Sequence, residues 1–412
     1  MAAAGCARVS AVSSNTQLQA LADGARASGK LALDTEFMGE GRYRTLLCLV
    51  QLAMPEEAGA ADPIEIVDPL AENVDAGPLA TVLADPAVEV VVHAGRQDIA
   101  LIRRWLATDV TNVFDTQVAA GFVGLGAQSS YESLLSELLD VRVRKTASFT
   151  RWDARPLSQE QIGYAREDVV HLLELAAELE RRLEEVGRLA WAREECEPLQ
   201  RASDDRDPDV IFSRLPRVHG LNVSGRAVAR ELVAWREETA ARRDRPVQSV
   251  LSDAALMELA RRKPSRKDEL GRIRGIGAAG SARVAEQVLQ AVRRGSERAP
   301  EAAPADRRPP QPKPEDAPLV ALAEALLRSR AREAGLAYEL LAARADLQAI
   351  VTARRDGAGE AEVRTLRGWR RELVGEELLQ LLDGEVSLSV GHESGRPRLV
   401  VDPAPRGERA NG

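Results

Sequence analysis

Two carboxylates stand two positions apart in a short apolar segment, LALDTEF, at residues 31–37. In a β-strand, successive side chains lie on opposite faces, so the leucines share one face and Asp34 and Glu36 share the other. Taken alone, such a pair is more often part of a solvated strand face than of a catalytic site. The interpretation therefore depends on which other residues the fold brings near these two acids.

Two further acids, Asp98 and Asp168, stand where helices are expected. Asp98 follows the apolar run VEVVVHAG, at the start of a predicted helix. Asp168 lies in GYAREDVVHLL, four positions after Tyr164, so the phenol and the carboxylate project from one helix face. Four carboxylates held close together repel one another, and bound divalent cations relieve that repulsion. We therefore predict that Asp34, Glu36, Asp98 and Asp168 form one metal site.

Phosphodiester hydrolysis is the chemistry that suits a site of this kind. Two ions about 3.5 to 4 Å apart activate a water molecule and neutralise the leaving 3′ oxygen in an in-line displacement. Ligands that are all oxygen atoms favour Mg²⁺ or Mn²⁺. Because the ordinary pKa of tyrosine is roughly 10, Tyr164 is better suited to orienting the water than to removing its proton at neutral pH.

Three segments, DTEF, HAGRQD and YAREDV, in this order resemble the exonuclease motifs of the tyrosine-containing branch of the DEDD superfamily. Between the second and third motifs, NVFDTQVAAGF and RKTASFTRWDARPLSQEQ resemble the ribonuclease D family, over about 150 residues in all. The resemblance implies a ribonuclease H-like α/β fold and two metal ions, Mg²⁺ or Mn²⁺, on Asp34, Glu36, Asp98 and Asp168. It also implies removal of 5′-nucleotides from RNA 3′ ends, in the maturation of precursor tRNA.

Residues 39–52 depart from the family pattern. The family commonly has an aromatic-aromatic-Pro turn shortly after its first motif, whereas this sequence reads GEGRYRTLLCLVQL. Only Tyr43 keeps the aromatic character. Because the turn is expected near the entry of the RNA 3′ end, the departure affects the predicted substrate preference more than the predicted chemistry.

Four residues before the third motif are candidate RNA contacts. Lys145 and Arg151 are candidates for phosphate binding, since similar positions in the family lie on the substrate side. Trp152 and Arg155 are candidates too, although tryptophan more often anchors a core and Arg-Pro often precedes a helix. All four are predicted RNA contacts.

Residues 1–200 are expected to form the catalytic domain, a mixed sheet flanked by helices. Short apolar runs, LALDTEF, LLCLVQLAM, IEIVDP and VEVVVH, alternate with helical patterns up to about residue 120. Asp115, in FDTQ, is expected to act in a turn or as a cap. A longer helical stretch follows, and Ser158 and Gln161 have capping-box spacing within it.

The block at 206–296 is the basic part of a chain whose net charge is −8. From Arg206 to Arg298 there are 20 Lys and Arg against 12 Asp and Glu, which gives this segment about +8 and leaves about −16 elsewhere. Release of counterions favours the binding of a polyanion to such a segment. The block also resembles the helicase-and-RNase-D C-terminal (HRDC) domain, a helical bundle that binds nucleic acid. The predicted phosphate contacts, each equally well explained as solvated surface, are Arg242, Arg243, Arg262, Lys263 and Lys267.

Glycines at 275, 277 and 280 have GxGxxG spacing, which alone suggests dinucleotide binding. The motif requires a preceding apolar strand, and here the preceding residues are strongly polar. We therefore expect a helix-loop-helix junction and no nucleotide cofactor.

The remainder of the chain is predicted to hold a linker and a third domain. Residues 297–318 are rich in proline, alanine and charge, as an extended linker is. Residues 319–403 are expected to form a second, diverged HRDC-like helical domain, which either binds nucleic acid or only packs against the others. A β-hairpin is expected around VSLSVGHESGRPRLVV.

Composition narrows the class of protein. The three cysteines, Cys6, Cys48 and Cys196, are far apart and include no CxxC pair, so neither a disulfide framework nor a zinc cluster is expected. No window of about 18 apolar residues predicts a membrane span. We expect a cytoplasmic monomer that acts on RNA 3′ ends; a 3′-to-5′ DNA exonuclease and a catalytically inactive RNA-binding scaffold are the alternatives.

Overall fold

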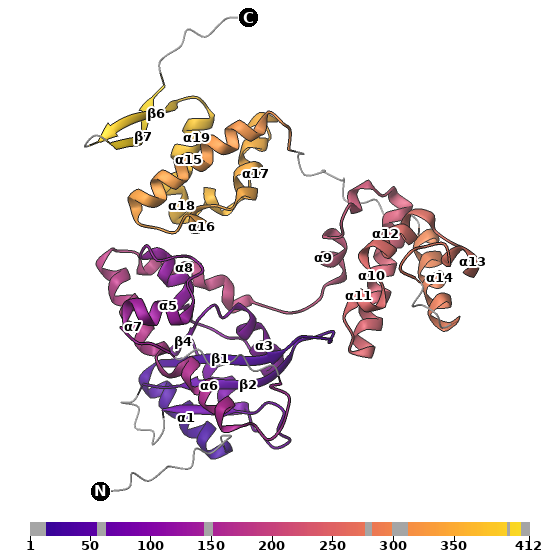
Figure 1. The fold of residues 1–412 in the computed structure, drawn as a ribbon, viewed down its shortest axis with the longest axis horizontal. Helices are drawn as coiled ribbons and strands as arrows, with labels where there is room; N and C mark the ends of the chain where they lie inside the picture. The colour runs from indigo at the N-terminus through magenta and orange to yellow at the C-terminus, as the bar shows by residue number, and fades with distance from the viewer. Residues whose placement is uncertain are drawn as a thin grey trace, which may run out of the picture.

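The computed structural model describes residues 14–55, 63–143, 151–276, 282–298, 312–393 and 396–404 (Figure 1). Lys145, Gly277 and Gly280 lie outside these ranges, as does most of the predicted linker, so the expectations about them stay predictions. No helix within the described ranges is long and apolar enough to cross a membrane.

A five-stranded mixed sheet lies at the centre of the N-terminal part, in the order β3-β2-β1-β4-β5. Strand β1 pairs antiparallel with β2, and the register between them shifts after Glu36. On its other side β1 pairs parallel with β4. The predicted mixed sheet flanked by helices is thus confirmed. The strands are β1 (Lys30–Met38), β2 (Leu46–Ala53), β3 (Ile64–Val67), β4 (Glu89–Val92) and β5 (Val113–Asp115).

Helices cover both faces of this sheet, because alternate residues of β1 enter different cores. Leu31 and Leu33 pack with residues of α1, α2 and α3, whereas Ala32 packs on the opposite face with residues of α4, α5 and α7. The helices of this part are α1 (Asn15–Ser28), α2 (Gly77–Leu83), α3 (Arg96–Leu106), α4 (Thr116–Phe122), α5 (Tyr131–Leu138), α6 (Gln159–Val170), α7 (Leu172–Glu185) and α8 (Leu189–Cys196), followed by the 3₁₀ turn η2 (Glu197–Arg201).

Two caps predicted from the sequence are present. The Ser158 side chain accepts a hydrogen bond from the Gln161 amide, and the Gln161 side chain accepts one from the Ser158 amide, so α6 begins with a capping box. The Asp115 carboxylate accepts hydrogen bonds from the amides of Gln117 and Val118 at the start of α4. Such caps satisfy backbone donors that a helix leaves unpaired at its N-terminus.

A separate helical bundle follows, here called the middle unit and defined as α9 to α14. Its core contains Leu232, Trp235, Leu256 and Val288, all of them buried. The elements are α9 (Pro208–Ser213), η3 (Val218–Gly220), α10 (Val223–Arg243), α11 (Val247–Val250), α12 (Asp253–Arg262), α13 (Lys267–Leu270) and α14 (Ala282–Glu297).

The last part, here called the C-terminal unit, packs directly on the N-terminal part. Trp369 stacks on Trp191 of α8 and meets the edge of Phe122 of α4, each with ring centroids 5.1 Å apart. The predicted terminal hairpin is present as the antiparallel pair of β6 and β7. The elements are α15 (Asp316–Ala334), α16 (Tyr338–Leu341), α17 (Arg344–Arg355), η4 (Arg364–Leu366), α18 (Gly368–Arg370), the π-helical turn η5 (Arg371–Gly375), α19 (Glu376–Leu382), β6 (Val386–Glu393) and β7 (Arg396–Pro403).

Candidate active site

The acids predicted from the sequence come from three different elements. Asp34 and Glu36 lie on β1, in the central position of the sheet, and Asp98 lies in the first turn of α3. Asp168 and Tyr164 lie four residues apart on α6, which packs against β1 and β2. The fold therefore brings together residues that are up to 134 positions apart in the sequence.

A tight turn between β4 and α3 places Asp98. Ala94 has a positive φ of 53°, and a Cβ atom on Gly95 would come within 2.5 Å of the Val92 side chain, so only glycine fits there. The buried carboxylate of Asp115 accepts hydrogen bonds from the amides of Ala94 (3.0 Å) and Gly95 (2.9 Å). Asp115 therefore fixes the start of α3 as well as the start of α4.

The electrostatics of the site are those of several carboxylates crowded together. Burial raises the pKa of the Asp34 carboxyl well above its usual range, and the charges of the other three acids raise it further. Burial, together with the charges of Asp168 and Asp98, raises the pKa of Glu36 to about 8. Burial also raises the pKa of Asp168 to about 7, with the charges of Glu132 and Glu167 as the next causes. A bound cation would relieve this repulsion, so the donor set fits a divalent metal ion.

The Asp98 carboxylate has a side-chain hydrogen-bond partner on β1. The Thr35 hydroxyl, which alternation along β1 places on the face opposite Asp34 and Glu36, donates a hydrogen bond to the buried Asp98 carboxylate. Burial raises the pKa of Asp98, and this hydrogen bond lowers it. The carboxylate is thereby held toward Thr35 in this structure.

Within the described ranges, no group of three or more His, Cys, Asp or Glu side chains is arranged to hold one ion. The Asp98 carboxylate is engaged by Thr35 in this arrangement. Mg²⁺ at phosphoryl-transfer sites takes only one or two protein carboxylates and keeps water and substrate oxygens as its other ligands. The observation that fits a metal here is thus the repulsion among the acids, and their assignment as ligands stays a prediction.

Tyr164 lies beside the acids and keeps its proton. Burial raises the pKa of its hydroxyl, and the charges of Asp168, Glu36 and Asp34 act in the same direction. At neutral pH the hydroxyl is therefore a hydrogen-bond donor. Its ring centroid lies 6.1 Å from that of the buried Trp152.

Two residues at the site were not singled out from the sequence. Glu132 is the largest charge acting on Asp168, and it acts on Tyr164 as well. Its neighbour Tyr131, also in the first turn of α5, has a pKa raised by burial and by the charges of Asp168 and Asp34. Neither residue lies in a motif, and only the packing of α5 reveals them.

The candidate RNA contacts of the N-terminal part have unequal environments. Arg155 donates hydrogen bonds to both carboxylate oxygens of Asp68 (2.5 and 2.6 Å) and to the Cys48 carbonyl (2.8 Å). Trp152 is buried, whereas Arg151 is exposed and pairs with its neighbour Asp153. Arg151 is thus the described candidate with the most accessible guanidinium.

In the middle unit most of the predicted phosphate contacts are exposed. Arg242, Arg243, Arg262 and Lys267 lie on the surface, and Arg262 pairs with Glu258 at 2.5 Å. Lys263 is less exposed and donates a hydrogen bond to the Ser224 hydroxyl at 3.0 Å. Their contact with nucleic acid stays a prediction.

Comparison with known proteins assigns the sheet-containing part and the middle unit to known families. Residues 9–184 match the family model described as 3′-5′ exonuclease, and residues 225–292 match the HRDC domain. The chain is 37% identical to the ribonuclease D of Granulibacter bethesdensis, with 92% of this chain and 94% of the relative covered. It is 36% identical to that of Gluconacetobacter diazotrophicus, with 87% and 89% covered.

The solved structure of Escherichia coli RNase D, described as an exoribonuclease involved in structured RNA processing, superposes with a TM-score of 0.76 at 27% identity. It covers 90% of this chain and 98% of that one. The likeness therefore includes both helical units as well as the sheet. The chain belongs to the ribonuclease D family of 3′-5′ exoribonucleases.

Proposed function

We propose that this chain removes nucleotides one at a time from the 3′ ends of structured RNAs, precursor tRNAs among them, by two-metal-ion hydrolysis. The observation that carries the proposal is the crowding of buried acids at one place: burial raises the pKa values of Asp34, Glu36, Asp98 and Asp168, and the charges of the other acids raise those of Asp34 and Glu36 further. Structured RNA as a substrate class follows the description of the Escherichia coli relative.

In this proposal Asp34, Glu36, Asp98 and Asp168 would hold two Mg²⁺ or Mn²⁺ ions, which would activate the attacking water and neutralise charge on the scissile phosphate. Tyr164 orients the attacking water, because its protonated hydroxyl can donate a hydrogen bond but cannot accept a proton at neutral pH. Thr35 donates a hydrogen bond to Asp98, and a bound cation would compete for that carboxylate.

The rest of the chain serves RNA binding in this proposal. The domains are those predicted from the sequence: exonuclease at 1–200, HRDC at 206–296, linker at 297–318 and an HRDC-like domain at 319–403. In this proposal the exposed arginines and lysines of the middle unit contact phosphates of the RNA, and Lys145, Arg151, Trp152 and Arg155 are further candidate RNA contacts. The protein is expected to act as a monomer in the cytoplasm.

The experiment that tests this function is digestion of matched RNA and DNA oligomers with free and blocked 3′ ends, with and without EDTA. The proposal expects release of 5′-mononucleotides from RNA with a free 3′ end, and none with EDTA. Preference for DNA would favour the DNA exonuclease, and binding without release under all conditions would favour an inactive scaffold.

A matched pair of variants ties the activity to the site. Asp98→Asn should reduce metal-dependent release to the level seen with EDTA while RNA binding stays measurable. The control is Asp109→Asn, just beyond the same helix, whose carboxylate is 78% exposed and pairs with Arg103. If Asp98→Asn turned over like Asp109→Asn, the assignment of Asp98 would be refuted.

A further inference from the structure

The turn between β1 and β2, residues 39–45, reaches the middle unit through Tyr43. The Tyr43 hydroxyl donates a hydrogen bond to the Glu237 carboxylate of α10 at 3.1 Å. The Arg206 guanidinium donates to the same carboxylate at 2.6 Å and lies over the Tyr43 ring, 5.3 Å from its centroid. Glu237 is only 4% exposed, so a buried carboxylate of the middle unit is satisfied by Arg206, in the segment 202–207 that joins η2 to α9, and by a turn of the N-terminal part.

A second contact fixes the same turn to the end of α10. Arg42 pairs with Asp244 at 2.8 Å, and the Tyr43 amide donates to the same carboxylate at 3.2 Å. Asp244 caps the C-terminal end of α10 with a left-handed φ of 44°. The turn is therefore held at two points, by a side chain and by its own backbone.

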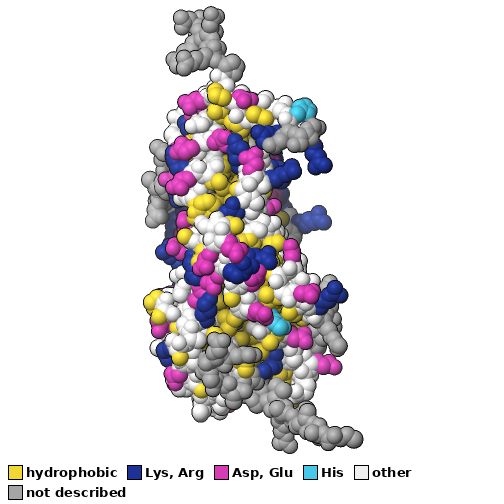
Figure 2. All heavy atoms as spheres, turned by 90° about the vertical axis from the view of Figure 1, so that its left-hand side faces the viewer, with side chains coloured by type: hydrophobic (Ala, Val, Ile, Leu, Met, Phe, Trp, Pro, Cys, Tyr) yellow, Lys and Arg dark blue, Asp and Glu magenta, His cyan; other side chains and the backbone are white. Residues whose placement is uncertain are grey.

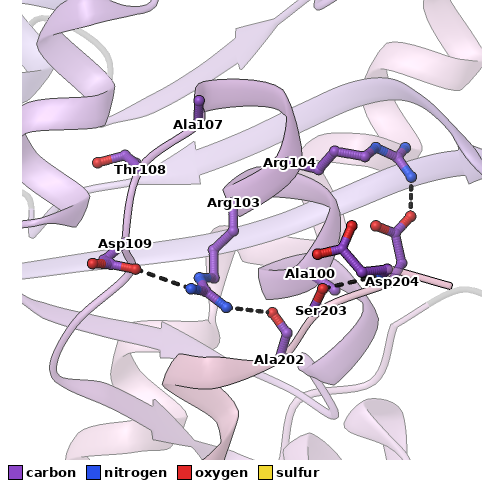
Figure 3. A pocket seen from close by; sticks show the side chains of 10 residues that line it. Ala100, Arg103, Arg104, Ala107, Thr108, Asp109, Ala202, Ser203 and Asp204 are labelled. Atoms are coloured by element: carbon purple, nitrogen blue, oxygen red, sulfur yellow. Dashed lines mark hydrogen bonds and ion pairs between the residues drawn. The ribbon is translucent and has the colours of Figure 1, made fainter. Parts of the chain in front are cut away.

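This turn is also tied to the residues of the active site. It directly continues β1, which carries Glu36, and its last residue, Thr45, accepts a hydrogen bond from Arg104 of α3. Arg104 also pairs with Asp204 of the segment 202–207, beside the contacts of Arg103 with Ala202 and Asp109 (Figure 3). The segment 202–207, the turn and the helix that carries Asp98 thus form one connected network.

A small apolar cluster completes the connection to Tyr164. Met38 and Leu46, the residues at the two strand ends that flank the turn, pack partly buried in one cluster with Trp152 and Tyr164. A displacement of the turn would therefore also displace the Tyr164 side chain. A misplacement of about 1 Å at a catalytic group costs up to about a hundredfold in rate.

We propose that Glu237 of the HRDC unit is a positioning residue for the exonuclease reaction: it holds the Tyr43 turn, and through it the arrangement of Glu36 and Tyr164. The HRDC unit is then part of the catalytic apparatus even for RNA too short to touch its basic surface. This inference rests on the proposed function, because it concerns the rate of that reaction.

The test compares two glutamates of the same helix. Glu237→Gln removes the charge that faces the turn, whereas Glu231→Gln removes a charge that pairs with Arg294 and Arg298 inside the middle unit, at 2.9 and 2.6 Å. Release of nucleotides from a short single-stranded RNA is measured in the full-length protein, together with thermal unfolding. We expect kcat to fall about tenfold in Glu237→Gln and to stay within about twofold of wild type in Glu231→Gln.

A double-mutant cycle separates positioning from general damage. Tyr43→Phe keeps the ring and removes only the hydroxyl that Glu237 accepts from. If the two residues act through each other, the double variant Tyr43→Phe/Glu237→Gln should be no slower than the slower single variant, because one link is broken in each case.

Two outcomes would overturn the inference: equal rates for Glu237→Gln and Glu231→Gln, or a double variant whose loss is the product of the single losses. A wild-type protein that releases no nucleotide from the same RNA would instead refute the proposed function, so the two failures are distinguishable.

Discussion

The two helical units are attached to the exonuclease part in opposite ways. The C-terminal unit shares an apolar core with it, in which Leu326 of α15 and Val374 of η5 belong to the same cluster as Phe122 and Leu175. The core of the middle unit, in the part of the chain that the structure describes, contains no residue before Ile211. The middle unit contacts the turn at Tyr43 through one ion pair, Arg42–Asp244, and through hydrogen bonds from Tyr43 to Glu237 and Asp244 instead.

The apolar contact of the C-terminal unit and the polar contact of the middle unit should differ in how easily they separate from the exonuclease part. Burial of aromatic and aliphatic side chains is not weakened by salt, whereas partly exposed ion pairs are screened by it and are individually worth little. Where the C-terminal unit meets the exonuclease part, Figure 2 shows Lys and Arg side chains intermingled with Asp and Glu on one continuous surface. We therefore describe the C-terminal unit as a fixed extension of the catalytic part and the middle unit as an adjustable one.

The largest loss of stability is expected from a substitution in the core that the C-terminal unit shares with the exonuclease part. Trp369→Ala removes a buried ring that stacks on Trp191, and truncation of this kind costs about 3–5 kcal/mol. Calorimetry should show the exonuclease transition itself moving to lower temperature. The control is Trp235→Ala in the core of the middle unit, which should lower only that unit's transition. An unchanged exonuclease transition in Trp369→Ala would contradict the shared core.

Metal binding should distinguish the shared core from the middle unit. It should raise the unfolding temperature of the shared core and leave that of the middle unit unchanged. At a concentration of about a hundred times its Kd, Mg²⁺ is expected to add about 2.7 kcal/mol. Asp168→Asn should remove the effect. An equal shift of both transitions would show that the stabilisation does not come from the acidic site.

The same stabilisation should depend on pH in a defined direction. The folded-state pKa values of Glu36 (about 8) and Asp168 (about 7) are raised, so the metal-free protein is stabilised when these groups hold protons and loses that stability as pH rises through 7 to 8. Mg²⁺ replaces those protons. The thermal shift with Mg²⁺ should therefore be larger at pH 8.5 than at pH 6, and a larger shift at pH 6 would contradict the assignment.

The smallest effect concerns the polar attachment of the middle unit. Raising NaCl from about 0.05 to about 0.5 M should weaken it by no more than about 1 kcal/mol, because the Arg42–Asp244 pair that joins the two parts is partly exposed and screened. Proteolysis of the segment 202–207, near Asp205, should become faster, whereas the stretch from η4 to α19, which packs in the core shared with the exonuclease part, should stay protected. Equal acceleration at both places would show that the two attachments are alike.

Much of the catalytic region could be predicted from the sequence because its signals are local. The alternation of LALDTEF predicted a strand with two acids on one face, and capping-box spacing predicted the start of α6. The four-residue spacing of Tyr164 and Asp168 predicted their shared helix face. Each of these depends on neighbours within a few positions, where strand and helix periodicity decide the geometry.

The parts that could not be predicted depend on contacts distant in sequence. Glu132 and Thr35 act on the acids only because α5 and β1 pack where they do. Tyr43 was predicted to lie near the RNA entry, but its link to Glu237, 194 positions away, follows from the docking of two units. Such contacts carry no periodicity that one sequence can reveal.

The most direct measurement of the central claim is a crystal structure with Mn²⁺ and a 5′-mononucleotide, in which anomalous scattering locates the ions. The account predicts two ions about 3.5 to 4 Å apart, held by Asp34, Glu36, Asp98 and Asp168, with Asp98 released from Thr35. Ions bound elsewhere, or a site at these four residues that stays without ions at saturating Mn²⁺, would contradict it.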